Sequence, residues 1–149
     1  MILSEQIVTA ALLVALTLCL QCAGVAMIVH WLRGGPLRDV RNLPMFRSAA
    51  LVMETTVAVI VLQGFVILVW AGCYRWLCLG SWESAFYFSA SSYSTVGYGD
   101  VVLPSHWRLF GPLESMMGVL MCGISVSLLF ALINKLIANE IRVQPGNLS

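Results

Sequence analysis

The chain has 149 residues, of which 60% are hydrophobic and only 10% are charged. Soluble domains average about 25% charged residues, so this composition excludes an ordinary soluble domain and leaves room for one membrane domain and little else. The net charge of +1 predicts no nucleic-acid partner, and we interpret the basic residues as signals of membrane topology.

The first half of the chain predicts two spanning helices separated by a basic loop. Ile7–Val29 and Thr55–Tyr74 contain no charged residue, and each reaches the ~20 residues that a transmembrane helix needs. Glu54 lies just inside the beginning of the second span, whose many apolar residues offset the cost of embedding an acid. Between the spans, His30–Ser48 combines four arginines with glycine and proline, which predicts a short loop.

A shorter membrane-embedded element follows. Ser84–Gly99 is uncharged, but it is too short and too rich in hydroxyl groups to cross a bilayer facing lipid. A re-entrant helix that returns as extended chain fits better, with Ser81 as its N-cap and Glu83 at the positive end of the helix dipole. A third span is then predicted over Ser115–Asn134, with Pro112 at the start of its helix.

The segment Thr95–Asp100 reads Thr-Val-Gly-Tyr-Gly-Asp and is too polar and glycine-rich to continue a helix. Non-helical backbone is tolerated at membrane depth only where protein buries it or where it lines a water-filled cavity. Gly97 and Gly99 alternate with larger residues, and glycine adopts positive φ angles cheaply. Alternate left-handed residues aim successive carbonyl oxygens in one direction. Several such strands around an axis would form oxygen rings that replace the water around a cation.

This segment resembles the selectivity filter of potassium channels, and all six residues of that motif are present in the same order. Coordination of the ion by rings of carbonyl oxygens is the known mechanism of that family. The resemblance covers residues 49–137, with Ser81–Ser94 as pore helix and Phe110–Leu136 as inner helix. Together with the uncharged span over residues 7–29, it predicts an all-α membrane protein similar to the small prokaryotic type, with three transmembrane helices, one re-entrant pore helix and a filter loop, assembled as a tetramer. The resemblance does not extend to residues 1–48, which are predicted from their composition to form an extra N-terminal transmembrane helix and a basic cytoplasmic loop. Residues 138–149 are polar and are predicted to form a short, frayed cytoplasmic tail.

The resemblance also implies roles for individual residues. Gly123 matches the hinge glycine of the inner helix. Ser127 and Ala131 recur on the same helical face, where small residues either allow close packing or line the central cavity. The K⁺-coordinating filter, and thus the metal site, is assigned to Thr95, Val96, Gly97 and Tyr98. Support of the filter and the outer mouth are assigned to Tyr87, Phe88, Ser91, Gly99 and Asp100.

The predicted function is passive, K⁺-selective conduction through a homotetrameric pore, with no catalytic residue and no cofactor besides the transported ion. The expected partners are potassium ions, the lipid bilayer and further copies of the chain. One alternative is a potassium transporter or accessory membrane subunit of the same pore ancestry. Another is a membrane enzyme, which would need clustered acids or histidines within the membrane, and the spans indicate only Glu54 as an embedded acid.

Filters of this family face outward, which predicts a multi-pass protein of the cell membrane with its N-terminus outside and its C-terminus in the cytoplasm. The positive-inside bias agrees, because six basic residues then lie inside and two outside. The six are Arg33, Arg38, Arg41, Arg47, Lys135 and Arg142; the two are Arg75 and Arg108. We expect Lys135 to reach lipid headgroups or to pair with Glu54.

Two further groups lie near the predicted outer boundary. Four tryptophans are interpreted as an aromatic belt at the membrane surface, namely Trp70, Trp76, Trp82 and Trp107. Cys73 and Cys78 flank an outer loop and could pair in an oxidising compartment, although nothing in the sequence requires it.

Overall fold

A computed structural model describes residues 3–35 and 45–143, and its elements follow the predicted order. The helices are α1 (Leu3–Gly34), α2 (Met45–Leu77), α3 (Trp82–Tyr93) and α4 (Phe110–Val143), with the 3-10 turn η2 (Ser105–Trp107) between the last two. No strand occurs in the two described ranges. The three long helices are each apolar and long enough to cross a membrane, which confirms the all-α expectation with three candidate spans.

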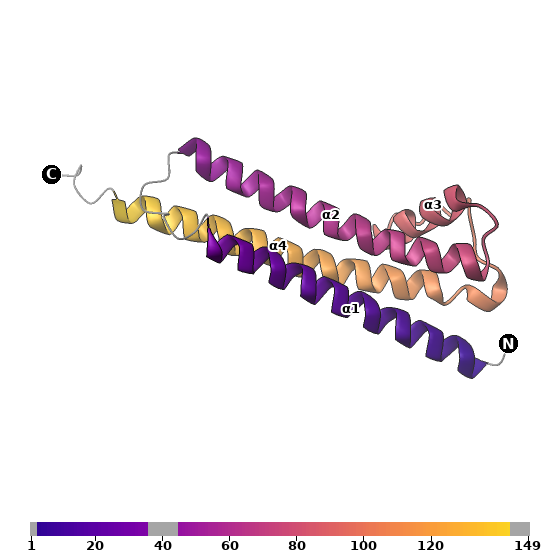
Figure 1. Cartoon of the computed structure of the whole chain (residues 1–149). Helices are drawn as coiled ribbons and strands as arrows, with labels where there is room; N and C mark the ends of the chain where they lie inside the picture. Colours follow the sequence, from indigo (N-terminus) through magenta and orange to yellow (C-terminus); the bar gives the residue numbers. More distant parts are fainter. Residues whose placement is uncertain (1–2, 36–44, 144–149) are drawn as a thin grey trace.

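The long helices lie side by side and alternate in direction (Figure 1). α1 leads away from the end of the bundle that carries the N-terminus, α2 returns to that end, and α4 leads away again. α3 and the loops around it lie at the same end, against α2 and α4 (Figure 1). The N-terminus and the Thr95–Asp100 segment therefore share one end of the bundle.

The loop between the first two spans is shorter than predicted. α1 continues to Gly34 and α2 begins at Met45, so both ends of the expected His30–Ser48 loop are helical. Charged and polar residues end an apolar span, but they do not by themselves end a helix, because their helix propensities are moderate to high. The predicted inside residues Arg38 and Arg41 lie outside the described residues.

The prediction of a frayed tail over 138–149 is wrong for residues 138–143, because α4 continues to Val143. The apolar span ends at Lys135, but no glycine or proline interrupts the following residues until Pro145. Proline is the residue that breaks a helix most strongly, because it lacks the backbone N–H and clashes with the preceding turn. The remaining residues of that tail lie outside the described ranges.

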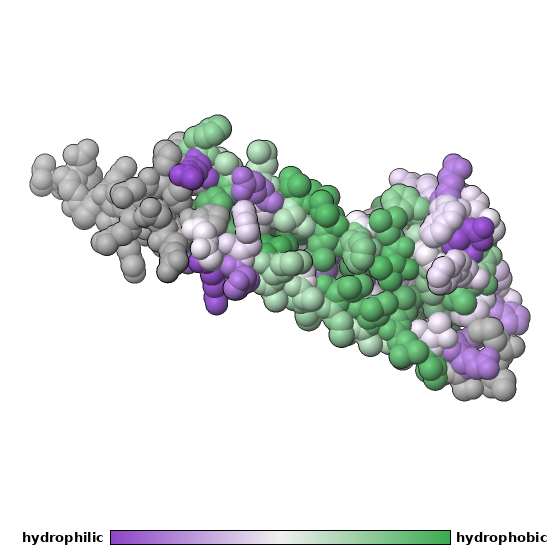
Figure 2. All heavy atoms as spheres, viewed as in Figure 1, coloured by the Kyte–Doolittle hydropathy of each residue, from purple (hydrophilic) through white to green (hydrophobic). Residues whose placement is uncertain are grey.

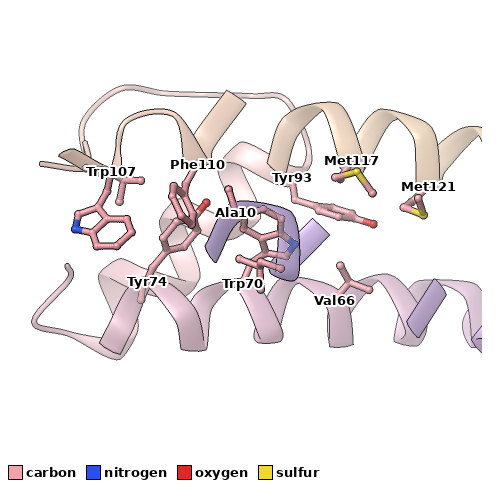
Figure 3. Packing of buried hydrophobic residues seen from close by; sticks show 12 residues of the cluster. Ala10, Val66, Trp70, Tyr74, Tyr93, Trp107, Phe110, Met117 and Met121 are labelled. Atoms are coloured by element: carbon pink, nitrogen blue, oxygen red, sulfur yellow. The ribbon is translucent and has the colours of Figure 1, made fainter. Parts of the chain in front are cut away.

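A buried hydrophobic core lies at the end of the bundle that carries α3 and joins all four helices (Figure 3). Its members are Ala10, Leu13, Val66, Trp70, Tyr74, Ala85, Tyr93, Leu103, Trp107, Phe110, Met117 and Met121. Val66, Trp70 and Tyr74 recur every four residues and therefore lie on one face of α2. The aromatic-belt interpretation is wrong for Trp70 and Trp107, which are core residues, whereas Trp76 and Trp82 are exposed.

Most of the surface of the long helices is apolar and uncovered in a single chain. Only 17% to 28% of the residues in the most apolar window of each span are buried. Figure 2, viewed as in Figure 1, shows hydrophobic residues across the middle of the bundle and hydrophilic residues gathered toward its two ends. Such a surface requires lipid or further protein to cover it.

Candidate functional site

α3 begins as predicted. The Ser81 side chain accepts a hydrogen bond from the backbone N–H of Glu83 at 3.2 Å, and Glu83 lies in the first turn. These contacts satisfy one of the otherwise unpaired N–H groups and place an acid at the positive end of the helix dipole. The helix ends at Tyr93 with Ser94 as its C-cap, so the Thr95–Asp100 segment follows α3 directly in sequence.

The backbone of the Thr95–Asp100 segment alternates in handedness. The φ angles of Thr95, Gly97 and Gly99 are 61°, 57° and 80°. The two glycines were expected to adopt this conformation, and Thr95 was not. A branched residue at positive φ is strained by about 1–3 kcal/mol and persists only where its surroundings hold it. Here the N–H of Thr95 donates to the carbonyl oxygen of Ser92 at 2.9 Å.

Ser91 organises the rest of the segment. Its carbonyl oxygen accepts hydrogen bonds from the N–H groups of Val96 and Gly97, at 2.9 and 3.2 Å, and its Oγ accepts one from the N–H of Tyr98 at 3.4 Å. The last turn of α3 therefore takes up the backbone donors of this segment. Within the described chain, no hydrogen bond uses the carbonyl oxygens of residues 95–98. Backbone carbonyls need partners, so these four are left for water or a cation.

The predicted outer-mouth residues come together in part. The Tyr87 hydroxyl donates to Asp100 Oδ2 at 2.8 Å, and its ring stacks on that of Tyr98 with 6.2 Å between centroids. The hydrogen bond to Asp100 raises the pKa of Tyr87. Phe88 makes none of these contacts, although it lines one cavity together with Tyr87, Gly97 and Asp100. It packs edge-on against Tyr74 of α2, with 5.0 Å between ring centroids.

α4 contributes a buried carboxyl group that sequence analysis missed. Glu114 has no exposed surface. The Tyr74 hydroxyl donates to its Oε2 at 2.7 Å, and the Ser89 hydroxyl lies 2.5 Å from its Oε1. Ser89 also lies 2.9 Å from the carbonyl oxygen of Ile67. This group, which we call the Glu114 cluster, ties α2, α3 and α4 together on the buried side of α3.

A family model described as an ion channel matches residues 55–135, which is more than half of the chain. The chain belongs to this ion channel family. Comparisons with curated proteins and with solved structures gave no match. The matched range includes α3 and the Thr95–Asp100 segment, whereas α1 lies outside it. A multi-pass membrane channel is therefore favoured over a membrane enzyme.

Glu114 adds a buried acid to the one predicted at Glu54, which lies within the second candidate span. Glu54 is exposed in the single chain, as is Lys135, and the structure shows no ion pair between these two described residues. Lys135 and Glu54 therefore do not pair within the single chain, and contact of Lys135 with lipid headgroups stays a prediction. A signal for Glu114 exists in the sequence: it shares a helical face with Phe110, Met117 and Met121, all of which are buried.

The glycine at which α4 packs closely is Gly118 and not the expected Gly123. A Cβ atom added to Gly118 would lie far closer than 3.0 Å to the carbonyl oxygen of Tyr93. Next to it, the Ser115 hydroxyl donates to the carbonyl oxygen of Ser92 at 2.7 Å. α4 therefore lies directly against the last turn of α3, at a position that only glycine permits.

The predicted hinge and cavity residues lie on an open face of α4. Gly123, Ser127 and Ala131 are all exposed in the single chain. A Cβ atom added to Gly123 would meet no atom within 4 Å, so this stripe does not serve packing between helices of one chain. Cys73 and Cys78 are both free thiols. The described residues contain no group of three or more His, Cys, Asp or Glu side chains that could hold a metal.

The Glu114 cluster leads to a prediction on stability. Glu114→Leu leaves the Tyr74 hydroxyl buried without an acceptor, which costs about 1–3 kcal/mol. Glu114→Gln keeps an acceptor oxygen and nearly the same shape, so it should retain most of the stability. The melting temperature of each purified variant in detergent measures its loss of stability. Glu54→Gln is the control, because Glu54 is exposed in the single chain. Equal losses in the Leu and Gln variants would show that the hydrogen bonds of the cluster are unimportant.

Proposed function

We propose that this channel conducts K⁺ selectively and passively, with the ions coordinated by the backbone carbonyl oxygens of Thr95, Val96, Gly97 and Tyr98. The observation that carries the proposal is the alternating left-handed backbone at Thr95, Gly97 and Gly99. Moving a bare cation out of water costs tens of kcal/mol by Born solvation, so other oxygens must replace its hydration shell. Carbonyl dipoles do so while the ion remains free to leave, because several weak sites share it.

The proposed pore is a homotetramer in the cell membrane. One chain carries a single Thr95–Asp100 segment, and a ring of carbonyl oxygens needs symmetric copies of it. The uncovered apolar surfaces of the spans and the exposed stripe of Gly123, Ser127 and Ala131 support assembly around a common axis. α3 then enters the membrane as the pore helix, and the negative end of its dipole, about half a charge, faces the central cavity.

The observed contacts support the roles proposed for the residues around the filter. Ser91 fixes the backbone of the filter, and Tyr87 holds Asp100 at the outer mouth beside Gly99. Phe88 supports the filter indirectly, through its packing against α2. Gly123 is the proposed hinge at which α4 bends when the channel opens, and no atom lies within 4 Å of the position that its Cβ would occupy.

Reconstitution tests the proposed function. The purified channel in liposomes with a K⁺ gradient should produce a K⁺ flux and only a small Na⁺ flux under the matched gradient. Liposomes without protein control for leakage. Equal fluxes of the two ions would overturn K⁺ selectivity while leaving a channel. The absence of any flux would overturn passive conduction and favour an accessory subunit.

The orientation is proposed from two observations. The N-terminus and α3 lie at one end of the bundle (Figure 1), and six of the eight basic residues belong to the other side under this orientation. The N-terminus is then outside and the C-terminus cytoplasmic. Cysteines introduced at Ser4 and Ser48, in a background without the native cysteines, can be labelled with an impermeant thiol reagent on intact cells. Labelling is expected at position 4 only, and labelling at position 48 only would reverse the orientation.

A further inference from the structure

α1 docks on its own chain through one narrow stripe, although it lies outside the range matched by the channel family. The buried residues of this stripe recur three, four or eight positions apart and are Ala10, Leu13, Thr17, Gln21, Gly24 and Leu32. They face α2 and α4. A Cβ atom added to Gly24 would overlap the Leu62 side chain, so α1 and α2 are in close contact. Trp70 Nε1 adds a hydrogen bond to Thr17 Oγ1 at 3.0 Å.

A continuous chain of polar side chains crosses the bundle at this stripe. Gln21 Nε2 of α1 and Gln63 Nε2 of α2 both donate to Ser125 Oγ of α4, at 3.4 and 2.8 Å. The Tyr93 hydroxyl of α3 donates to Gln63 Oε1 at 2.5 Å. Gln21, Ser125 and Tyr93 are all buried. We call this set of four side chains the polar latch; it joins all four helices.

The polar latch is a costly way to pack helices. Gln21 Oε1 is buried and has no hydrogen-bond partner, and an unpaired buried amide group costs free energy that an apolar side chain of similar size would avoid. The neighbouring Gly24 contact and the apolar residues of the stripe already hold α1 against α2. Close packing alone therefore gives no reason for a glutamine at this position.

The position of the polar latch along α4 suggests its role. Ser125 lies two residues beyond Gly123, in the part of α4 that moves if the helix bends at that glycine. Tyr93 is the last residue of α3, directly before the segment that forms the filter. α4 is one continuous helix from Phe110 to Val143 (Figure 1). Bending at Gly123 would carry Ser125 away from both glutamines and break the latch.

We propose that the polar latch holds α4 in its unbent, closed form, so that α1 controls how readily the channel opens. Gln21 and Gln63 are positioning residues, because they act on the pore through Ser125. The inference rests on the proposed function, because only a conducting channel has open and closed states. Hydrogen bonds between membrane helices are individually weak, and breaking one should shift the ratio of open to closed channels by about three- to twenty-fold.

Single-channel recording in planar bilayers tests the latch. Gln21→Leu should raise the open-to-closed ratio by about three- to twenty-fold, and Ser125→Ala should raise it at least as much. The control is Thr9→Val, because the Thr9 hydroxyl bonds only to the Glu5 carbonyl oxygen of its own helix, at 2.8 Å. The double variant of Gln21→Leu and Ser125→Ala should match Ser125→Ala alone, since residues that act through each other are not additive. Ion selectivity should be unchanged throughout.

The outcomes separate the latch from the function on which it rests. A conducting wild type whose Gln21→Leu variant behaves like Thr9→Val, or opens less, would overturn the latch alone. Additive effects in the double variant would also overturn it, because Gln21 would then act elsewhere. If the wild type carries no current, the proposed function fails. Hydrogen–deuterium exchange of α4 around Ser125 then decides the latch: exchange should be faster in Gln21→Leu than in Thr9→Val, and equal rates would refute it.

Discussion

Gly118→Ala is expected to destabilise the channel strongly. The added methyl group would overlap the Tyr93 carbonyl oxygen, and a backbone atom cannot rotate away as a side chain can. α4 must then move off the last turn of α3, which also weakens the Ser115–Ser92 hydrogen bond. Overpacking of this kind costs about 1–3 kcal/mol or more, and the lost hydrogen bond adds about 0.5–1.5 kcal/mol. Typical domains have a total stability of only about 5–15 kcal/mol.

Two other helical glycines provide matched controls. Cβ atoms added to Gly64 and Gly72 of α2 would meet nothing within 4 Å. Alanine at those positions should be neutral or stabilising, because it favours helix by about 1 kcal/mol over glycine. The melting temperature in detergent should fall for Gly118→Ala and hold or rise for the controls. A Gly118→Ala protein that melts with the controls would contradict the close approach of α4 to α3.

Gly97→Ala is expected to abolish K⁺ selectivity or conduction. Gly97 has a φ angle of +57°, and an L-residue in the left-handed region is strained by about 1–2 kcal/mol. No neighbouring atom of the chain lies within 4 Å of the added Cβ, so the effect comes from the backbone itself, and it would be repeated in every copy of the proposed tetramer. Relief of this strain rotates the peptide and turns a carbonyl oxygen out of the proposed ring.

Reversal potentials under mixed K⁺ and Na⁺ gradients measure this prediction. Gly80→Ala is the control, since Gly80 precedes α3, has no neighbour within 4 Å and does not have a positive φ angle. Its selectivity should equal that of the wild type. A Gly97→Ala channel with unchanged preference for K⁺ over Na⁺ would show that the carbonyl oxygens of residues 95–98 do not select the ion.

Several parts of the fold are determined by signals that lie close together in the chain. Long uncharged stretches predict the three spans, because each spanning helix must by itself supply enough apolar length to cross a membrane. The start of α3 is also local, since Ser81 and Glu83 are two residues apart. The left-handed conformation at Gly97 and Gly99 is permitted by the residue type, because glycine lacks a Cβ. None of these features depends on a distant partner.

Only the tertiary structure decides which of several similar residues is buried. In a membrane helix the lipid-facing and protein-facing sides are both apolar, so hydropathy along the chain does not identify the packed face. Glu114 is buried against Tyr74 and Ser89, which lie 40 and 25 residues earlier in the sequence and belong to two other helices. Glu54 meets no such partners. The same reason separates Gly118, which touches α3, from Gly123, which faces open space. The polar latch likewise exists only because four helices bring their polar side chains to one level of the bundle.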